Sequence, residues 1–161
     1  KGLVLLSPAI FYTSPLAKLT FLLKYIKKYS IKDYSEYYPG RKEAFFDIAD
    51  EKALEKRIAY KKVPLGCVAS ALALIKTVKK EIKNIHVPTL IIHSTRDHTI
   101  QPKSSKYIYD NLNLSPKEKK LIYLKNSGHV ITVDFDKKEV FKEVLNFINN
   151  KGVGNRTSIL L

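Results

Sequence analysis

The sequence predicts an α/β protein built on a parallel sheet, and three observations support this class. Residues 88–93 and 120–124 are short apolar runs bounded by polar residues, as in strands buried in a sheet. Segments with helical spacing of apolar residues follow them, at 103–112 and 140–148. Strand, helix, strand and helix without a hairpin signal indicate parallel pairing through crossover connections. A further apolar run at residues 3–6 predicts another strand of this sheet, buried on both faces.

The segment between this first strand and the later ones has a different character. Residues 11–65 are helix-like and contain no strand of comparable quality, so we predict a helical cap inserted into the sheet domain. After Pro64, apolar residues at helical spacing predict a long amphipathic helix. The predicted organisation is a core strand in residues 1–10, the cap in 11–65, the C-terminal part of the core in 66–150 and a flexible tail in 151–161.

The composition excludes several classes of protein. The chain has 161 residues, 45% of them hydrophobic, and a formal charge of +14. The charge comes mainly from lysines spread over many segments, so it predicts no nucleic-acid partner. No apolar stretch reaches the roughly 18 to 20 residues of a membrane span. The single cysteine, Cys67, cannot form an internal disulfide, so we expect a cytoplasmic protein. Because Cys67 lies at the start of a predicted amphipathic helix, we expect its thiol to be buried and inert.

Asp97 and His129 are the residues most suited to catalysis. Asp97 follows the predicted strand at 88–93, and His129 stands in Ser127-Gly128-His129 after the strand at 120–124. The carboxyl ends of parallel strands meet at one edge of a sheet, so we expect these side chains to lie together. A carboxylate that accepts the imidazole Nδ1–H leaves Nε2 free to take a proton from a nucleophile. The two residues are therefore predicted to be the acid and the base of a catalytic triad.

Three stretches of the sequence carry a resemblance to a known family. They are residues 87–97, 100–102 and 126–132, which read Val-Pro-Thr-Leu-Ile-Ile-His-Ser-Thr-Arg-Asp, Ile-Gln-Pro and Asn-Ser-Gly-His-Val-Ile-Thr. In this order they resemble the C-terminal part of an α/β hydrolase, most closely the bacterial carboxylesterase and monoacylglycerol lipase group, over about residues 2–148. The resemblance implies that Asp97 is the triad acid, that His129 is the triad base and that the cap covers an acyl pocket.

The family carries its nucleophilic serine in Gly-x-Ser-x-Gly, ahead of the acid and the histidine. No such motif occurs in the 161 residues. We therefore expect this chain to be the back part of a longer protein, with the N-terminal half as its partner, and to be inactive and poorly soluble alone.

Other residues have weaker assignments. Ile10, Phe11, His98 and Val130 are candidates for contact with the substrate. Asp134 and Asp136 are expected to start the closing helix, because acidic side chains favour a helix N-terminus. The histidines do not have the spacing of a metal site, and the predicted chemistry requires neither a metal nor a cofactor.

The expected function is hydrolysis of a carboxylic ester with an apolar acyl chain, by a Ser-His-Asp triad whose serine lies upstream. Two alternatives stay open. An upstream aspartate in place of the serine would make the protein a dehalogenase or an epoxide hydrolase. A protein that kept the fold without catalysis would be an interaction module.

Overall fold

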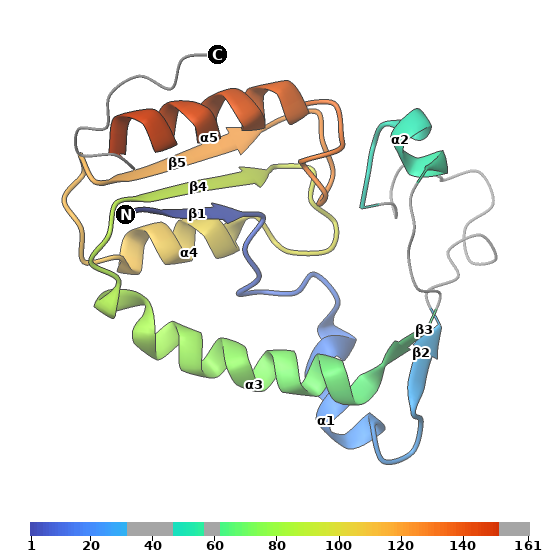
Figure 1. Ribbon diagram of the computed structural model, residues 1–161. Helices are drawn as coiled ribbons and strands as arrows, with labels where there is room; N and C mark the ends of the chain where they lie inside the picture. The colour runs from blue at the N-terminus through green and yellow to red at the C-terminus, as the bar shows by residue number, and fades with distance from the viewer. Residues whose placement is uncertain (32–46, 57–61, 152–161) are drawn as a thin grey trace.

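A three-stranded parallel sheet lies at the centre of the computed structural model, which describes residues 1–31, 47–56 and 62–151 (Figure 1). Its strand order is β1 (Leu3–Leu6), β4 (Thr89–Ser94), β5 (Lys119–Leu124). The register places Leu3 beside Thr89 and Thr89 beside Lys119. The predicted α/β class is confirmed. Because all three strands run in the same direction, the loops that follow them emerge at one edge of the sheet.

Two helices cover the faces of this sheet, α4 (Lys103–Asn111) on one side and α5 (Lys137–Lys151) on the other (Figure 1). Successive side chains of β4 point to opposite faces, so this strand contributes to two cores. One buried cluster contains Ile10, Ile82, Ile91, Ile108 and Leu112. The other contains Leu90, Ile92, Leu124, Ile131 and Val140. Both clusters lie next to β4 and hold it in place as it leads into the Asp97 loop.

The strand β1 is less buried than the sequence predicts. Its residues are half-buried, and Leu6 is 38% exposed, whereas every residue of β4 is buried. The reason is position, because β1 lies at the edge of this sheet and β4 lies between two neighbours. The expectation of burial on both faces is therefore wrong for β1 in this structure.

The predicted cap region contains short helices and also a pair of strands. β2 (Tyr29–Ile31) pairs antiparallel with β3 (Lys62–Pro64), so the expectation of helix without strand is corrected here. Two strands so far apart in sequence leave no periodic signal, because each is only three residues long. The helical elements are η1 (Pro15–Leu19), α1 (Thr20–Leu23) and α2 (Glu51–Glu55). Residues 32–46 and 57–61 of the predicted cap lie outside the described residues.

The long helix predicted after Pro64 is confirmed as α3 (Leu65–Glu81), followed by η3 (Ile82–Asn84). Cys67 lies in the first turn of α3 and is exposed, so the prediction of a buried thiol is wrong. Among residues 1–31, 47–56 and 62–151, no helix combines the length and the apolarity needed to cross a bilayer. The predicted tail lies outside the described residues from 152 onward.

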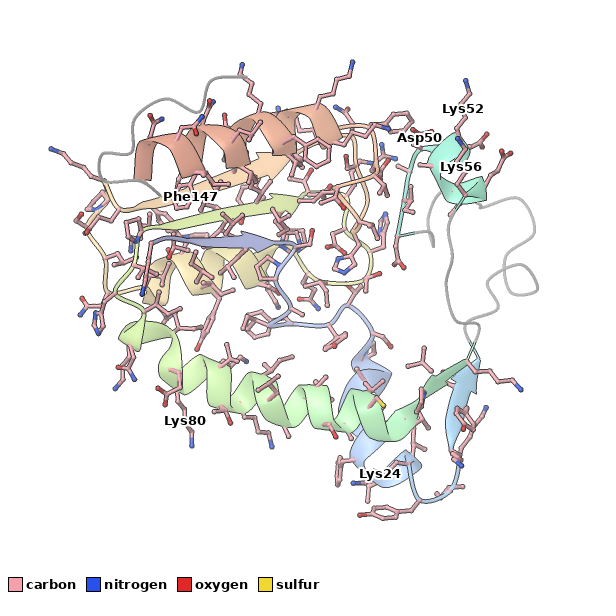
Figure 2. All side chains as sticks on the ribbon, viewed as in Figure 1. Lys24, Asp50, Lys52, Lys56, Lys80 and Phe147 are labelled. Atoms are coloured by element: carbon pink, nitrogen blue, oxygen red, sulfur yellow. The ribbon has the colours of Figure 1, made fainter. Side chains whose placement is uncertain are left out.

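The basic residues are distributed over separate elements. In Figure 2, Lys52 and Lys56 lie at α2, whereas Lys24 lies just after α1 and Lys80 lies toward the far end of α3. These labelled lysines therefore belong to different parts of the surface.

Candidate active site

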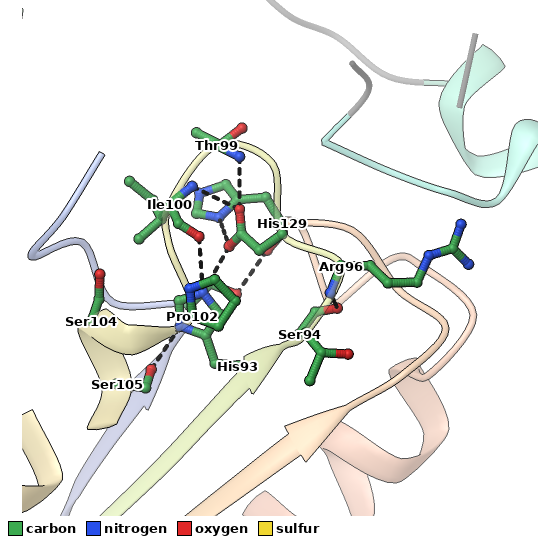
Figure 3. Close-up of polar contacts among 12 residues, drawn as sticks. His93, Ser94, Arg96, Thr99, Ile100, Pro102, Ser104, Ser105 and His129 are labelled. Carbon is green, nitrogen blue, oxygen red and sulfur yellow. Dashed lines mark hydrogen bonds and ion pairs between the residues drawn. The ribbon is translucent and has the colours of Figure 1, made fainter. Parts of the chain in front are cut away.

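The loops that follow β4 and β5 bring Asp97 and His129 into direct contact. Asp97 lies three residues beyond the end of β4 at Ser94, and His129 lies five residues beyond the end of β5 at Leu124. The Asp97 Oδ2 atom is 2.7 Å from His129 Nδ1 (Figure 3). The Asp97 side chain is fully buried, whereas the His129 side chain is 27% exposed. The geometry thus joins a buried acid to a histidine that reaches the surface.

Backbone groups hold the Asp97 carboxylate from its other side. Its Oδ1 atom accepts hydrogen bonds from the N–H groups of Thr99, at 2.9 Å, and Ile100, at 2.7 Å. Burial alone would raise the pKa of Asp97. The hydrogen bonds from His129, His93 and the Ile100 N–H outweigh this effect, so the pKa lies well below its usual range. Asp97 is therefore ionised in the folded protein and able to stabilise a protonated His129.

A second histidine, His93, contacts the same carboxylate oxygen. Its Nε2 atom is 3.0 Å from Asp97 Oδ2, and its Nδ1 atom is 2.6 Å from Ser105 Oγ on α4. From the sequence, His93 received no role beyond its exclusion from a metal site, so this contact was not predicted. One signal was available, because the last residues of a strand that leads to a catalytic loop lie beside that loop. His93 has such a position, because it stands at the end of the predicted strand and four residues before Asp97.

The backbone of His129 is fixed by a residue at the end of β1. Ser7 Oγ donates to the His129 carbonyl oxygen at 2.9 Å, and the Ser7 N–H donates to the Ile92 carbonyl oxygen at 2.8 Å. Ser7 has φ of 45°, a left-handed conformation that is uncommon for a residue other than glycine. Such a conformation persists only where its surroundings determine it. Ser7 thus connects the end of β1 to the loop that carries His129.

Two aspartates shape the His129 loop. Asp136 Oδ2 accepts from the N–H groups of Asn126, at 3.0 Å, and Ser127, at 2.9 Å. Burial would raise the pKa of Asp136, but the hydrogen bonds from Asn126 and Ser127 lower it overall. Asp134 is fully buried and holds the other side of the loop. The hydrogen bonds described for these two carboxylates thus go to the loop and its neighbours, and their predicted role at the start of the closing helix stays a prediction.

Asp134 also joins the His129 loop to the segment 47–50 of the predicted cap. Its carboxylate accepts from the N–H groups of Ala49 at 2.7 Å, Asp50 at 2.8 Å, Gly128 at 2.6 Å and Phe135 at 2.8 Å. A Cβ atom at Gly128 would lie 2.7 Å from the Asp47 carbonyl oxygen, which explains why glycine stands there. The segment and the loop are therefore packed closely.

We expect Asp134→Ala to lower the free energy of unfolding of the whole protein by about 3 kcal/mol, because four N–H groups, of which that of Gly128 is buried and the others are partly buried, lose their acceptor. Urea denaturation followed by circular dichroism measures this change. Asp110→Ala is the matched control, since Asp110 is exposed and its ion pair with Lys106 contributes about 1 kcal/mol or less. Equal effects of the two substitutions would contradict the structural role of Asp134.

The four residues predicted to contact the substrate lie in different places. Ile10 and Phe11 line a hollow of about 710 Å³ between η1, α1 and α3. Val130 lines another hollow of about 710 Å³, together with Ile48 and residues of α2. His98 is exposed beside Asp97. The structure does not gather the four into one pocket, and their contact with substrate stays a prediction.

The described residues contain no group of three or more His, Cys, Asp or Glu side chains that could hold a metal ion. At this edge of the sheet, the structure places a histidine against a fixed carboxylate, an arrangement that can accept and donate a proton.

Known proteins are similar to this chain in sequence and in fold. The family model described as serine aminopeptidase, S33, matches residues 1–136. The thermostable monoacylglycerol lipase of Bacillus sp. (strain H-257) is 32% identical over 92 residues, which are 57% of this chain and 36% of the lipase. The carboxylesterase of Bacillus subtilis (strain 168) is 29% identical over 98 residues, which are 61% of this chain and 39% of the esterase.

A solved structure reported for the metagenome-derived lipolytic enzymes LipS and LipT superposes with a TM-score of 0.75 at 26% identity. The superposition covers 92% of this chain and 55% of that structure. The chain thus spans about half the length of that structure and matches less than two fifths of either Bacillus protein. The parallel sheet, the order of its elements and the family match lead to one conclusion, that the chain belongs to the serine aminopeptidase S33 family and has part of the α/β-hydrolase fold.

Proposed function

We propose that the whole protein hydrolyses carboxylic esters with an apolar acyl chain, using Asp97, His129 and a serine that precedes this chain in the sequence. The single observation that carries the proposal is the hydrogen bond of 2.7 Å between His129 Nδ1 and the buried Asp97 carboxylate. The monoacylglycerol lipase and carboxylesterase relatives support an ester as the substrate.

In this mechanism the Asp97 carboxylate accepts the Nδ1–H of His129, so Nε2 is the nitrogen that takes the proton of the serine hydroxyl. The serine oxygen attacks the ester carbonyl, and His129 then gives the proton to the leaving alcohol. In the second half of the reaction, water attacks the carbonyl of the acyl-serine. His129 takes the proton of this water and gives it to the departing serine oxygen, while Asp97 again orients the ring. Asp97 stays ionised throughout, and its negative charge stabilises each imidazolium that forms.

The cap belongs to the proposal as well. We place residues 11–65 over the acyl pocket. The segment 47–50 supports this placement, because it is hydrogen-bonded to the His129 loop through Asp134 and the Val130 N–H. Substrate bound beneath such a cap would lie close to the catalytic histidine.

Labelling of the whole protein with a fluorophosphonate tests the identity of the nucleophile. We expect one covalent adduct, on a serine outside the 161 residues, and loss of p-nitrophenyl butyrate hydrolysis in proportion to labelling. Peptide mapping by mass spectrometry locates the adduct.

Three other outcomes would contradict the proposal. Hydrolysis of a haloalkane or an epoxide without labelling would indicate an aspartate nucleophile. A protein that is neither labelled nor active would be an interaction module. The family description names a peptidase, so an aminoacyl p-nitroanilide belongs in the same assay. Faster cleavage of that amide than of any ester would indicate that the substrates are peptides.

A further inference from the structure

His93 is a fully buried titratable side chain that the proposed mechanism does not use. It points from β4 toward α4, where Ser105 is also fully buried (Figure 3). The His93 Nε2 atom faces two acceptors, Asp97 Oδ2 at 3.0 Å and the Ile100 carbonyl oxygen at 3.4 Å. The Nδ1 atom faces the Ser105 hydroxyl at 2.6 Å.

These partners determine the tautomer of His93. A nitrogen that faces a carboxylate and a carbonyl oxygen has to carry a proton, so Nε2 is the donor. A hydroxyl can donate, so Ser105 satisfies Nδ1 while the ring stays neutral. His129 becomes positive beside the same carboxylate during the proposed reaction, and a second imidazolium there would oppose that step.

The Asp97 carboxylate therefore has four donors, two on each oxygen. Oδ2 accepts from His129 Nδ1 and His93 Nε2, and Oδ1 accepts from the N–H groups of Thr99 and Ile100. The bond from His93 competes with His129 for the same oxygen. It thus limits how strongly that oxygen attracts the His129 proton, and it fixes the plane of the carboxylate.

We propose that His93, oriented by Ser105, is a positioning residue of the catalytic pair, which holds Asp97 Oδ2 toward His129 and limits the basicity of that oxygen. This inference rests on the proposed function, because it assumes that Asp97 and His129 act on a substrate. In this chain of contacts Asp97 and His129 are the other titratable groups, and Ser105 and the Ile100 carbonyl are neutral. Arg96 turns its guanidinium group away from the cluster (Figure 3).

Removal of the donor should change both rate and pH dependence. In the whole protein, His93→Leu is expected to lower kcat for p-nitrophenyl butyrate about 10- to 100-fold, the usual effect of losing a hydrogen bond to a charged group. Asp97 would become more basic, so His129 would hold its proton to higher pH. The acid limb of the kcat/KM profile should therefore move to higher pH, with KM little changed.

Two further variants separate positioning from packing. His93→Gln keeps a side-chain N–H group at this site and should recover part of the rate and of the pH profile. His86→Leu removes an exposed histidine between η3 and β4 and should leave both unchanged. A folded His93→Leu protein with the wild-type rate and pH profile would overturn the proposal.

NMR of the imidazole nitrogens tests the contact independently of activity and of folding of the His93→Leu variant. In the wild-type protein we expect a protonated Nε2 at His93, a hydrogen-bonded acceptor at Nδ1 and slow exchange of the Nε2 proton with solvent. Ser105→Ala should alter the Nδ1 signal, whereas Ser104→Ala, which removes an equally buried hydroxyl from α4, should leave the His93 ring signals unchanged.

A His93 ring that is protonated at Nδ1 and unprotonated at Nε2 in the wild-type protein would also overturn the proposal. The outcomes remain distinguishable from failure of the proposed function. If the wild-type protein has no hydrolase activity, the proposed function is wrong. If the wild-type protein is active and the His93→Leu variant has the same rate and pH profile, only the role proposed for His93 is wrong.

Discussion

The His129→Gln variant of the whole protein is expected to hydrolyse p-nitrophenyl butyrate with kcat lower by roughly 10⁵-fold, because members of a triad act as a unit. Glutamine is polar and similar in length, but its amide cannot take the proton of a serine hydroxyl at neutral pH. The loop should keep its shape, since Ser7 bonds to the backbone carbonyl of residue 129 and not to the imidazole.

His86→Gln is the matched control for this variant. His86 is exposed between η3 and β4 and should tolerate the same substitution with an unchanged rate. Circular dichroism and thermal melts of the two variants establish that both are folded. Turnover by His129→Gln within tenfold of the wild-type value would remove His129 from the mechanism.

The Asp97→Asn variant is expected to lower kcat by about 10⁴-fold through the tautomer of His129. The asparagine oxygen would accept the N–H bonds of Thr99 and Ile100, which now go to Oδ1. Its NH₂ group would then face His129 Nδ1 and donate to it. His129 would carry its proton on Nε2, and that nitrogen could no longer accept the proton of the nucleophile.

Asp110→Asn provides the isosteric control, because Asp110 lies exposed on α4 and pairs only with Lys106 in the contacts described for it. We expect the control to retain wild-type kcat. The ¹⁵N chemical shifts of the His129 ring report the tautomer directly. An Asp97→Asn protein with Nδ1 still protonated and turnover near the wild-type rate would contradict this role for Asp97.

Much of the fold could be predicted because its main elements are encoded locally. The apolar run at 88–93 became β4, and the helical spacing after Pro64 became α3. These signals are periodic over several residues, and burial on a sheet or a helix face requires such patterns. The short pair β2 and β3 has no comparable signal, since each strand gains its partner only when distant segments meet.

The contact between Asp97 and His129 was predictable from chain order and from the geometry of parallel sheets. Asp97 and His129 each follow a strand, and neighbouring parallel strands end at the same edge. The positions of the candidate substrate residues were less predictable. Ile10 and Val130 line separate hollows, because their surroundings depend on how residues of the cap region pack against the core.

The sequence by itself therefore determined the parallel sheet, the crossover helices and the acid and base at its edge, because strand and helix periods and chain order are local properties of the sequence. Only the tertiary structure decided that the Asp97 carboxylate contacts two histidines, His93 and His129, and that Asp134 joins the His129 loop to residues 47–50. The physical reason is that these bonds unite groups from separate segments, and many of the donors are backbone N–H groups, which every residue except proline carries.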